Sequence, residues 1–123
     1  MLYYIQDIMA IKLKVSIAPA VILMVLKKKI DNKEIDTWEY DEDGDFTHSS
    51  SQWKNKAWFT PICKDDILEF GLLGRKETKM TMMEYSVYHG RFSEMLLNYF
   101  SNYIVSFELT TPYTSNIDTD EIE

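Results

Sequence analysis

The stretch TMMEYSVYHGRFSEMLLNYFSNYIVSFELTT, residues 81–111, decides the fold class of this chain. Its first four residues form a capping-box pattern, in which the Thr81 hydroxyl accepts the third amide of a helix and Glu84 reaches back to the Thr81 amide. Apolar residues then recur at spacings of three and four, which is typical of a helix with one buried face. They are Tyr85, Tyr88, Phe92, Met95, Leu96, Tyr99 and Phe100. We therefore expect one long amphipathic helix.

A strand is expected directly after this helix. Ser101 and Asn102 can end the helix, since asparagine tolerates the left-handed conformation found at helix C termini. From residue 103 to residue 110, apolar side chains at alternate positions give the period-two pattern of a half-buried strand. Pro112 stops the pattern, so this strand is predicted to end there and to pair back onto a sheet.

The segment YDEDGDF, residues 40–46, is predicted to be the turn of a hairpin. Gly44 supplies the positive φ that a tight loop requires, and the flanking aspartates can bond their own backbone. EF-hand calcium loops also place carboxylates at alternate positions, as Asp41, Asp43 and Asp45 do, but they need glycine at position six and glutamate at position twelve. Here glycine is at position four and glutamine at position twelve. We therefore assign no metal and no other cofactor, with a weak, exposed cation site as the remaining alternative.

A second hairpin is expected over residues 56–74. Trp58 and Phe59 begin its first strand, and Pro61 suggests an edge or bulge because proline cannot donate to a ladder. The acidic pair Asp65–Asp66 turns the chain, and apolar residues at 68, 70 and 72 form the buried face of the returning strand.

The N-terminal third has the least regular pattern. Residues 12–17 alternate polar with apolar side chains, which favours a short strand. Residues 21–30 are rich in β-branched residues and are predicted to form another strand that turns at Asp31–Asn32. The alternative is a helix that opens at Pro19, because proline suits the first helical position and leucine, methionine and lysine are good helix formers. Met9 is an alternative start, which would leave residues 1–8 as a loosely held leader.

Together these elements predict an α+β domain. We expect an antiparallel β-meander sheet packed on one long C-terminal α-helix, followed by a final strand, in a two-layer arrangement. A chain of 123 residues is long enough for one such core and too short for a second. Residues 1–112 are therefore assigned to a single domain and residues 113–123 to an acidic, flexible tail.

Charge and composition disfavour several classes of function. The formal net charge is −7, and every charge from residue 36 to residue 45 is negative, so direct binding of nucleic acid is disfavoured. The apolar run at residues 18–26 is shorter than the roughly 20 residues that span a bilayer, so we expect no membrane association. The single cysteine, Cys63, fits a reducing, cytoplasmic compartment.

We expect a small non-enzymatic interaction protein that binds a basic protein partner. No nucleophile, base or phosphate-cradling loop occurs in the spacing that catalysis needs, so we assign no catalytic residue. An acidic single domain suits an inhibitor or immunity protein against a basic toxin or nuclease, or an adaptor, acting as a monomer or homodimer. The expected partner-binding residues are Asp36, Glu39, Asp41, Glu42, Asp43 and Asp45.

The alternative is a small ligand-binding module or minor enzyme. Residues 85–92, YSVYHGRF, place functional groups beside Gly90, and a helix tolerates glycine where another group must approach closely. In this interpretation Tyr88, His89 and Arg91 flank a pocket for an anion or peptide carboxylate between helix and sheet. In the structural interpretation, which we favour, His89 lies at the edge of the core and Arg91 pairs outward.

Overall fold

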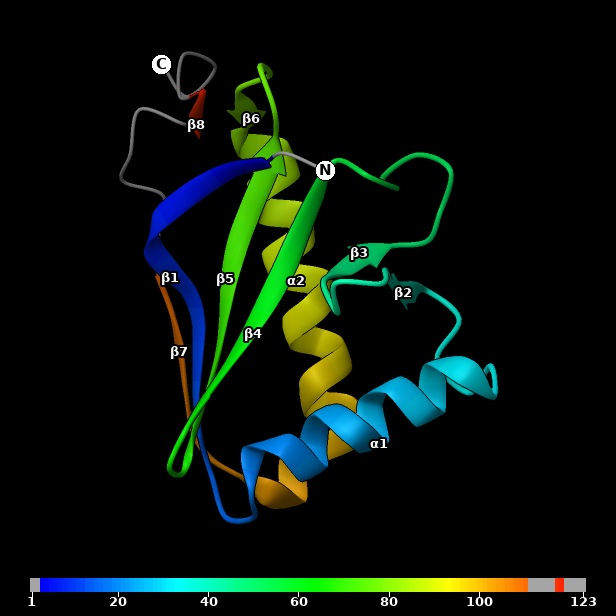
Figure 1. The fold of residues 1–123 in the computed structure, drawn as a ribbon, viewed down its shortest axis with the longest axis vertical. Helices are drawn as coiled ribbons and strands as arrows, with labels where there is room; N and C mark the ends of the chain where they lie inside the picture. Colours follow the sequence, from blue (N-terminus) through cyan, green and yellow to red (C-terminus); the bar gives the residue numbers. More distant parts are fainter. Residues whose placement is uncertain (1–2, 111–116, 119–123) are drawn as a thin grey trace.

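The computed structural model describes residues 3–110 and 117–118. Figure 1 shows the course of the chain through two long helices and a twisted sheet. In chain order the elements are β1 (Tyr3–Val15), α1 (Pro19–Asp31), β2 (Trp38–Tyr40), β3 (Phe46–His48), β4 (Ala57–Lys64), β5 (Ile67–Arg75), β6 (Met80–Thr81), α2 (Met82–Phe100), the short 3-10 helix η1 (Ser101–Tyr103), β7 (Ile104–Leu109) and β8 (Ile117–Asp118).

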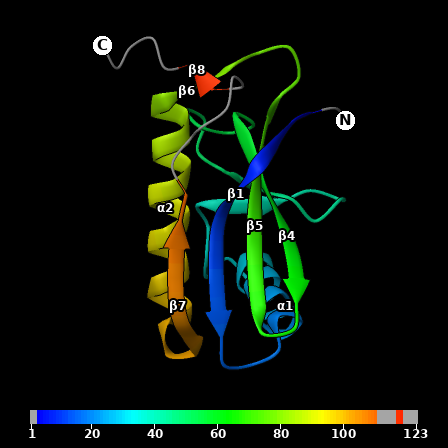
Figure 2. The same cartoon turned by 90° about the vertical axis from the view of Figure 1, so that its left-hand side faces the viewer.

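Six strands form one antiparallel sheet in the order β2-β3-β4-β5-β1-β7. Strands β2 to β5 follow one another as a meander, whereas β1 lies between β5 and β7. Both helices lie on one side of the sheet, and Figure 2 looks onto the other side. Strands β6 and β8 form a separate parallel pair. The predicted α+β class is confirmed, with its meander, its long C-terminal helix and its final strand in two layers.

The capping box at the start of α2 forms as predicted. The Glu84 backbone N–H donates to Thr81 Oγ1 and the Thr81 backbone N–H donates to Glu84 Oε1, both at 3.0 Å. Arg75, the last residue of β5, forms an ion pair with the same Glu84 carboxylate at 2.8 Å. The helix start is therefore fixed both by its own backbone and by the sheet.

Both predicted hairpins are present. Strands β2 and β3 pair from Trp38 opposite His48 to Tyr40 opposite Phe46, and Gly44 in their loop has a φ of 83°. Strands β4 and β5 pair without a register shift over the whole length of β4 and turn at residues 65–66. The segment YDEDGDF is therefore a turn, because its glycine adopts the left-handed conformation that the loop requires.

The strand predicted for residues 21–30 is wrong, because these residues belong to α1. Ile22 and Leu26, one helical turn apart, are fully buried, whereas Met24 between them is 61% exposed. Pro19 lies at the helix start and lysines fill the last turn, where cations interact favourably with the helix dipole. A second helix therefore covers the sheet where only one was expected. Within residues 3–110 and 117–118, neither helix has both the length and the apolar character that a bilayer crossing needs.

The structure describes most of the N-terminal segment and a short part of the predicted tail. Strand β1 begins at Tyr3, inside the segment predicted to be a leader, and Tyr3 to Ile5 pair with Leu73 to Arg75 of β5. Most of the predicted acidic tail lies outside the described residues. Its Ile117–Asp118 segment forms β8 beside β6.

Aromatic side chains fill the space between α2 and the sheet. Phe92 stacks on Phe59 with ring centroids 4.4 Å apart and meets Trp38 and Phe70 edge-on at 4.8 and 4.9 Å. Phe59, Phe70 and Phe92 are fully buried. This cluster holds β2, the central strands and α2 together, and it therefore positions the residues of the site described next.

Candidate functional site

A cleft of about 700 Å³ lies between the connection from α1 to β2 and one side of α2. One wall is the backbone segment 34–38, and His48 of β3 adds a buried side chain. The opposite wall is formed by α2, through Arg91, Glu94, Met95, Asn98 and Tyr99. Its volume falls in the range of roughly 300–1,000 Å³ that is typical of ligand sites.

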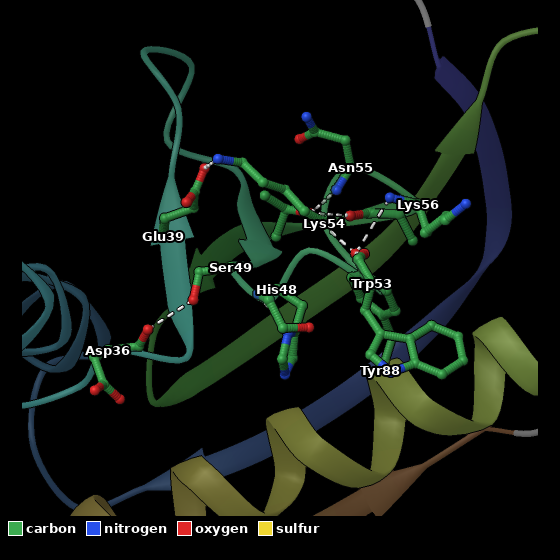
Figure 3. A network of polar contacts seen from close by, with 12 residues as sticks. Asp36, Glu39, His48, Ser49, Trp53, Lys54, Asn55, Lys56 and Tyr88 are labelled. Atoms are coloured by element: carbon green, nitrogen blue, oxygen red, sulfur yellow. Dashed lines mark hydrogen bonds and ion pairs between the residues drawn. The ribbon is translucent and has the colours of Figure 1, made fainter.

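Hydrogen bonds hold the 34–38 wall in place. The Ser49 hydroxyl donates to the Asp36 carbonyl oxygen at 2.7 Å, and the Ser49 backbone N–H donates to the Thr37 carbonyl at 2.9 Å. The Tyr99 hydroxyl reaches across from α2 to the Glu34 carbonyl at 3.2 Å. Figure 3 shows Ser49 joined to Asp36 above α2. The cleft is thus built from three segments that are far apart in the sequence.

The charges around the cleft are mainly negative. Three carboxylates, Glu34, Asp36 and Glu94, line it against one guanidinium, that of Arg91. Glu34 is already bonded to Lys29 at 2.9 Å. Asp36 and Glu94 make no ion pair within the described residues, so their carboxylates can receive a cationic group from outside.

His48 is the buried titratable group of the cleft. It is 2% exposed, its ring meets Trp38 edge-on at 5.0 Å, and its Nδ1 accepts the Ser50 backbone N–H at 3.1 Å. Burial lowers the pKa of His48 below its ordinary value, and the nearby positive charge of Arg91 lowers it further. The imidazole is therefore neutral at pH 7, with its proton on Nε2.

The structure separates the three residues of the predicted pocket. Tyr88 is fully buried, and its hydroxyl donates to the Trp53 carbonyl, lies 3.1 Å from Thr47 Oγ1 and accepts the Lys56 N–H at 3.3 Å. Figure 3 shows this hydroxyl among the 53–56 backbone. Tyr88 therefore joins α2 to the loop after β3 and does not line the cleft.

His89 and Arg91 lie on different sides of α2. His89 is 5% exposed, stacks on Tyr85 at 3.8 Å and makes a 3.0 Å hydrogen bond with the Tyr85 carbonyl. Its ring also meets Phe59 of the sheet at 5.7 Å. Arg91 is exposed and lines the cleft. The histidine that accompanies Arg91 is thus His48, from a different part of the chain.

The six acidic residues predicted as one binding surface are divided between two ends of the β2–β3 hairpin. Asp36 lies at the cleft end, and Glu39 forms an ion pair with Lys54 at 3.5 Å (Figure 3). Glu42 and Asp43 are exposed in the loop at the other end. Of the six predicted residues, Asp36 is the one that lines the cleft.

Asp41 and Asp45 shape this loop from within. Asp41 Oδ1 accepts the backbone N–H groups of Asp43 and Asp45, each at 3.0 Å. Asp45 is 6% exposed; burial raises its pKa, a hydrogen bond with Thr60 lowers it, and the charges of Asp41 and Asp43 raise it further. A Cβ at Gly44 would lie 3.6 Å from Lys27 Nζ, so α1 supplies a positive charge to the loop.

The same loop brings three carboxylates together. Oxygen atoms of Asp41, Asp43 and Asp45 lie within 4.8 Å of one another, a separation that a cation could bridge. Local hydrogen bonds from the backbone account for the position of Asp41, as in an Asx turn. We therefore describe this loop as a hairpin turn, in agreement with the sequence pattern.

Several cleft residues had a weaker signal in the sequence. Arg91, Glu94 and Asn98 follow one another at spacings of three and four, so they share a polar stripe beside the apolar face of the helix. The sequence shows this stripe, but it does not show which segments face the stripe across the cleft. The fold brings two other segments to this stripe. The β2–β3 hairpin carries His48, and residues 34–38 connect α1 to that hairpin.

No family model, curated protein or solved structure matches this chain. Its function is therefore inferred from the cleft, from the side chains that line it and from the charges that they carry.

Proposed function

We propose that the protein is a non-enzymatic interaction protein, of the inhibitor, immunity or adaptor type, that binds a basic protein partner through the cleft. One observation carries this proposal: the cleft has three carboxylates against one guanidinium, and two of these carboxylates have no ion pair within the described residues. A lysine or arginine side chain of a partner is the complementary group. The net charge of −7 would also steer a basic partner toward the surface.

The groups around the cleft favour binding over catalysis. His48 is the natural candidate for a general base. In a catalytic triad the Nδ1–H of the histidine donates to a carboxylate that orients the ring, whereas His48 Nδ1 accepts a backbone N–H. Cys63, the only thiol, lies in β4 and does not line the cleft. The groups that remain are charged side chains on rigid elements, which suit recognition.

A titration with a basic peptide tests the proposal. We choose an acetylated and amidated peptide of alternating arginine and glycine, so that no peptide carboxylate contributes. In NMR spectra of the ¹⁵N-labelled protein, the largest shift changes are expected at residues 34–38, 48 and 91–99. Affinity should fall as salt is raised from about 50 to about 200 mM, because exposed ion pairs are screened.

Two matched double variants separate the cleft from the hairpin loop. Asp36→Asn with Glu94→Gln should weaken binding roughly tenfold, because the neutral amides lose the charge-assisted hydrogen bonds to the peptide. Glu42→Gln with Asp43→Asn removes the same charge from the exposed loop and should change affinity less than about twofold. If the loop variant weakens binding as much as the cleft variant, the cleft is not the binding site and the proposal fails.

A further inference from the structure

The inner wall of the cleft presents a hydrogen-bond donor in a fixed direction. His48 Nδ1 is used by the Ser50 N–H, so the neutral ring carries its proton on Nε2. Edge-on contacts with Trp38 and Tyr88 hold the ring, and Figure 3 shows it directed toward α2. Within the described residues Nε2 has no hydrogen-bond partner, although the side chain is 2% exposed. This donor is aimed into the cleft and is available to a ligand.

Arg91 provides a second donor beside it. Arg91 lines the same cleft as His48, and its guanidinium makes no ion pair within the described residues. Glu94 lies three positions further along the same helix and leaves Arg91 unpaired. A guanidinium and a neutral imidazole N–H together match the two oxygens of a carboxylate.

A simple anion does not fit this cleft. Glu34, Asp36 and Glu94 outnumber Arg91, so an anion without a positive group would meet net repulsion. Since Glu34 is bonded to Lys29, Asp36 and Glu94 are the carboxylates available to a cationic group. The complementary ligand therefore carries a carboxylate and a cation on one short scaffold.

We propose that the cleft binds a basic α-amino-acid residue with a free α-carboxylate, through Arg91 and His48 for the carboxylate and Asp36 and Glu94 for the side-chain cation. A chain that ends in arginine or lysine has this chemistry, and so does the free amino acid. The proposal rests on the proposed function and makes it more specific, because it states which part of the basic partner enters the cleft. The volume of about 700 Å³ is ample for one such residue and its neighbours.

The test compares acetyl-Gly-Gly-Arg as the free acid with the same peptide as the amide, by NMR titration of the intact protein. General electrostatics favours the amide, because the amide has the higher positive charge and the protein carries a net charge of −7. The proposal predicts the opposite order, with the acid binding roughly tenfold more tightly through its charge-assisted hydrogen bonds. Equal affinities, or tighter binding of the amide, would overturn it.

Two variants with the same change in charge show where the carboxylate binds. Arg91→Gln should remove the preference for the acid, because the remaining carboxylates then repel it. Lys14→Gln removes a positive charge from an exposed position on β1, away from the cleft, and should keep the preference. His48→Asn, whose shorter amide reaches the position of Nδ1 and not that of Nε2, should reduce the preference without abolishing binding of the amide. If Lys14→Gln acts as strongly as Arg91→Gln, the preference is a long-range effect of charge and the carboxylate subsite is excluded.

Free L-arginine distinguishes the two sources of the ligand. If free L-arginine binds about as tightly as the peptide acid, the cleft is assigned to a free amino acid. If the peptide acid alone binds, the cleft is assigned to a chain terminus. Both results support the subsite. If neither ligand with a free carboxylate binds more tightly than the amide, the subsite is wrong. In that case the proposed function still stands if the amidated arginine–glycine peptide shifts the cleft residues, and it fails if that peptide does not.

Discussion

The two sides of helix α2 show how differently one element can be used. The side that faces the sheet carries Phe92 and Tyr88, both fully buried within the aromatic cluster. The side that faces the cleft carries Arg91 and Glu94, which are exposed and make no ion pair within the described residues. The first side stabilises the fold, and the second is free to contact a ligand. Substitutions on the side that faces the sheet should therefore lower stability. Substitutions on the side that faces the cleft should lower ligand affinity and leave stability nearly unchanged.

The largest expected effect is that of Phe92→Ala. Because this ring is fully buried against four other aromatic rings, its truncation should lower the free energy of unfolding by about 3–5 kcal/mol. Urea denaturation followed by tryptophan fluorescence measures the change. The adjacent variant Arg91→Gln is the control and should stay within about 0.5 kcal/mol of the wild type. A loss below about 1 kcal/mol for Phe92→Ala would mean that the cluster does not hold α2 on the sheet.

Tyr88→Phe tests a polar contact on the buried side. The substitution keeps the ring but removes the hydroxyl that contacts the Trp53 carbonyl, the Thr47 hydroxyl and the Lys56 N–H. Leaving buried groups without their partner should lower the free energy of unfolding by about 1–3 kcal/mol. Tyr103→Phe is the matched control, since Tyr103 is 43% exposed. Equal effects of the two substitutions would contradict the assigned role of the hydroxyl.

The pH dependence of stability tests the burial of His48 on the cleft side. The pKa of His48 is lowered in the folded state from the ordinary value of 6.5, so the unfolded chain binds the proton more tightly. The contribution of His48 to the free energy of unfolding is fully present above about pH 6.5. It is lost as the pH falls from 6.5 toward the folded-state pKa.

Denaturation midpoints of the wild type and of His48→Gln between pH 7.5 and about pH 5 measure this effect. The variant should lose less stability over this interval, because glutamine does not titrate. Parallel curves for the two proteins would show that His48 titrates as it does in the unfolded chain.

The smallest expected effect is on the stability of the cleft double variant. Asp36→Asn with Glu94→Gln removes two charges that have no ion pair within the described residues, so the free energy of unfolding should change by less than about 0.5 kcal/mol. The same variant should weaken binding of the basic peptide roughly tenfold. A loss of more than about 1 kcal/mol in stability would assign these carboxylates to the fold instead of the binding site.

The predictions from sequence were best where the signal is local. The capping box of α2, the apolar face of that helix and the turn at Gly44 depend on residues within a few positions of one another, and all three are present in the structure. The final strand was also expected, although its pairing with β1 brings together residues 89 to 98 positions apart. This pairing is a consequence of the topology, and the sequence of neither strand alone predicts it.

The error at α1 has a physical reason. Val21, Val25 and Ile30 have the β-branched side chains that favour strands, while Pro19 and the neighbouring leucine and lysine residues suit a helix equally well. The outcome depends on what the segment packs against. In the structure Ile22 and Leu26 are buried at helical spacing beside the core, and this burial decides between the two states.

Local order in the chain was thus sufficient for the capping box of α2 and for the turns of the two hairpins, because each arises from contacts between near neighbours. The tertiary structure decided the cleft, since the connection from α1 to β2, the base of the β2–β3 hairpin and the polar stripe of α2 must meet to form it. In the sequence His89 lies two positions before Arg91, and because a helix turns by about 100° per residue, these two side chains point to nearly opposite sides of α2. Packing instead brought His48 into the cleft that Arg91 lines, because the aromatic cluster fixes the hairpin against the helix.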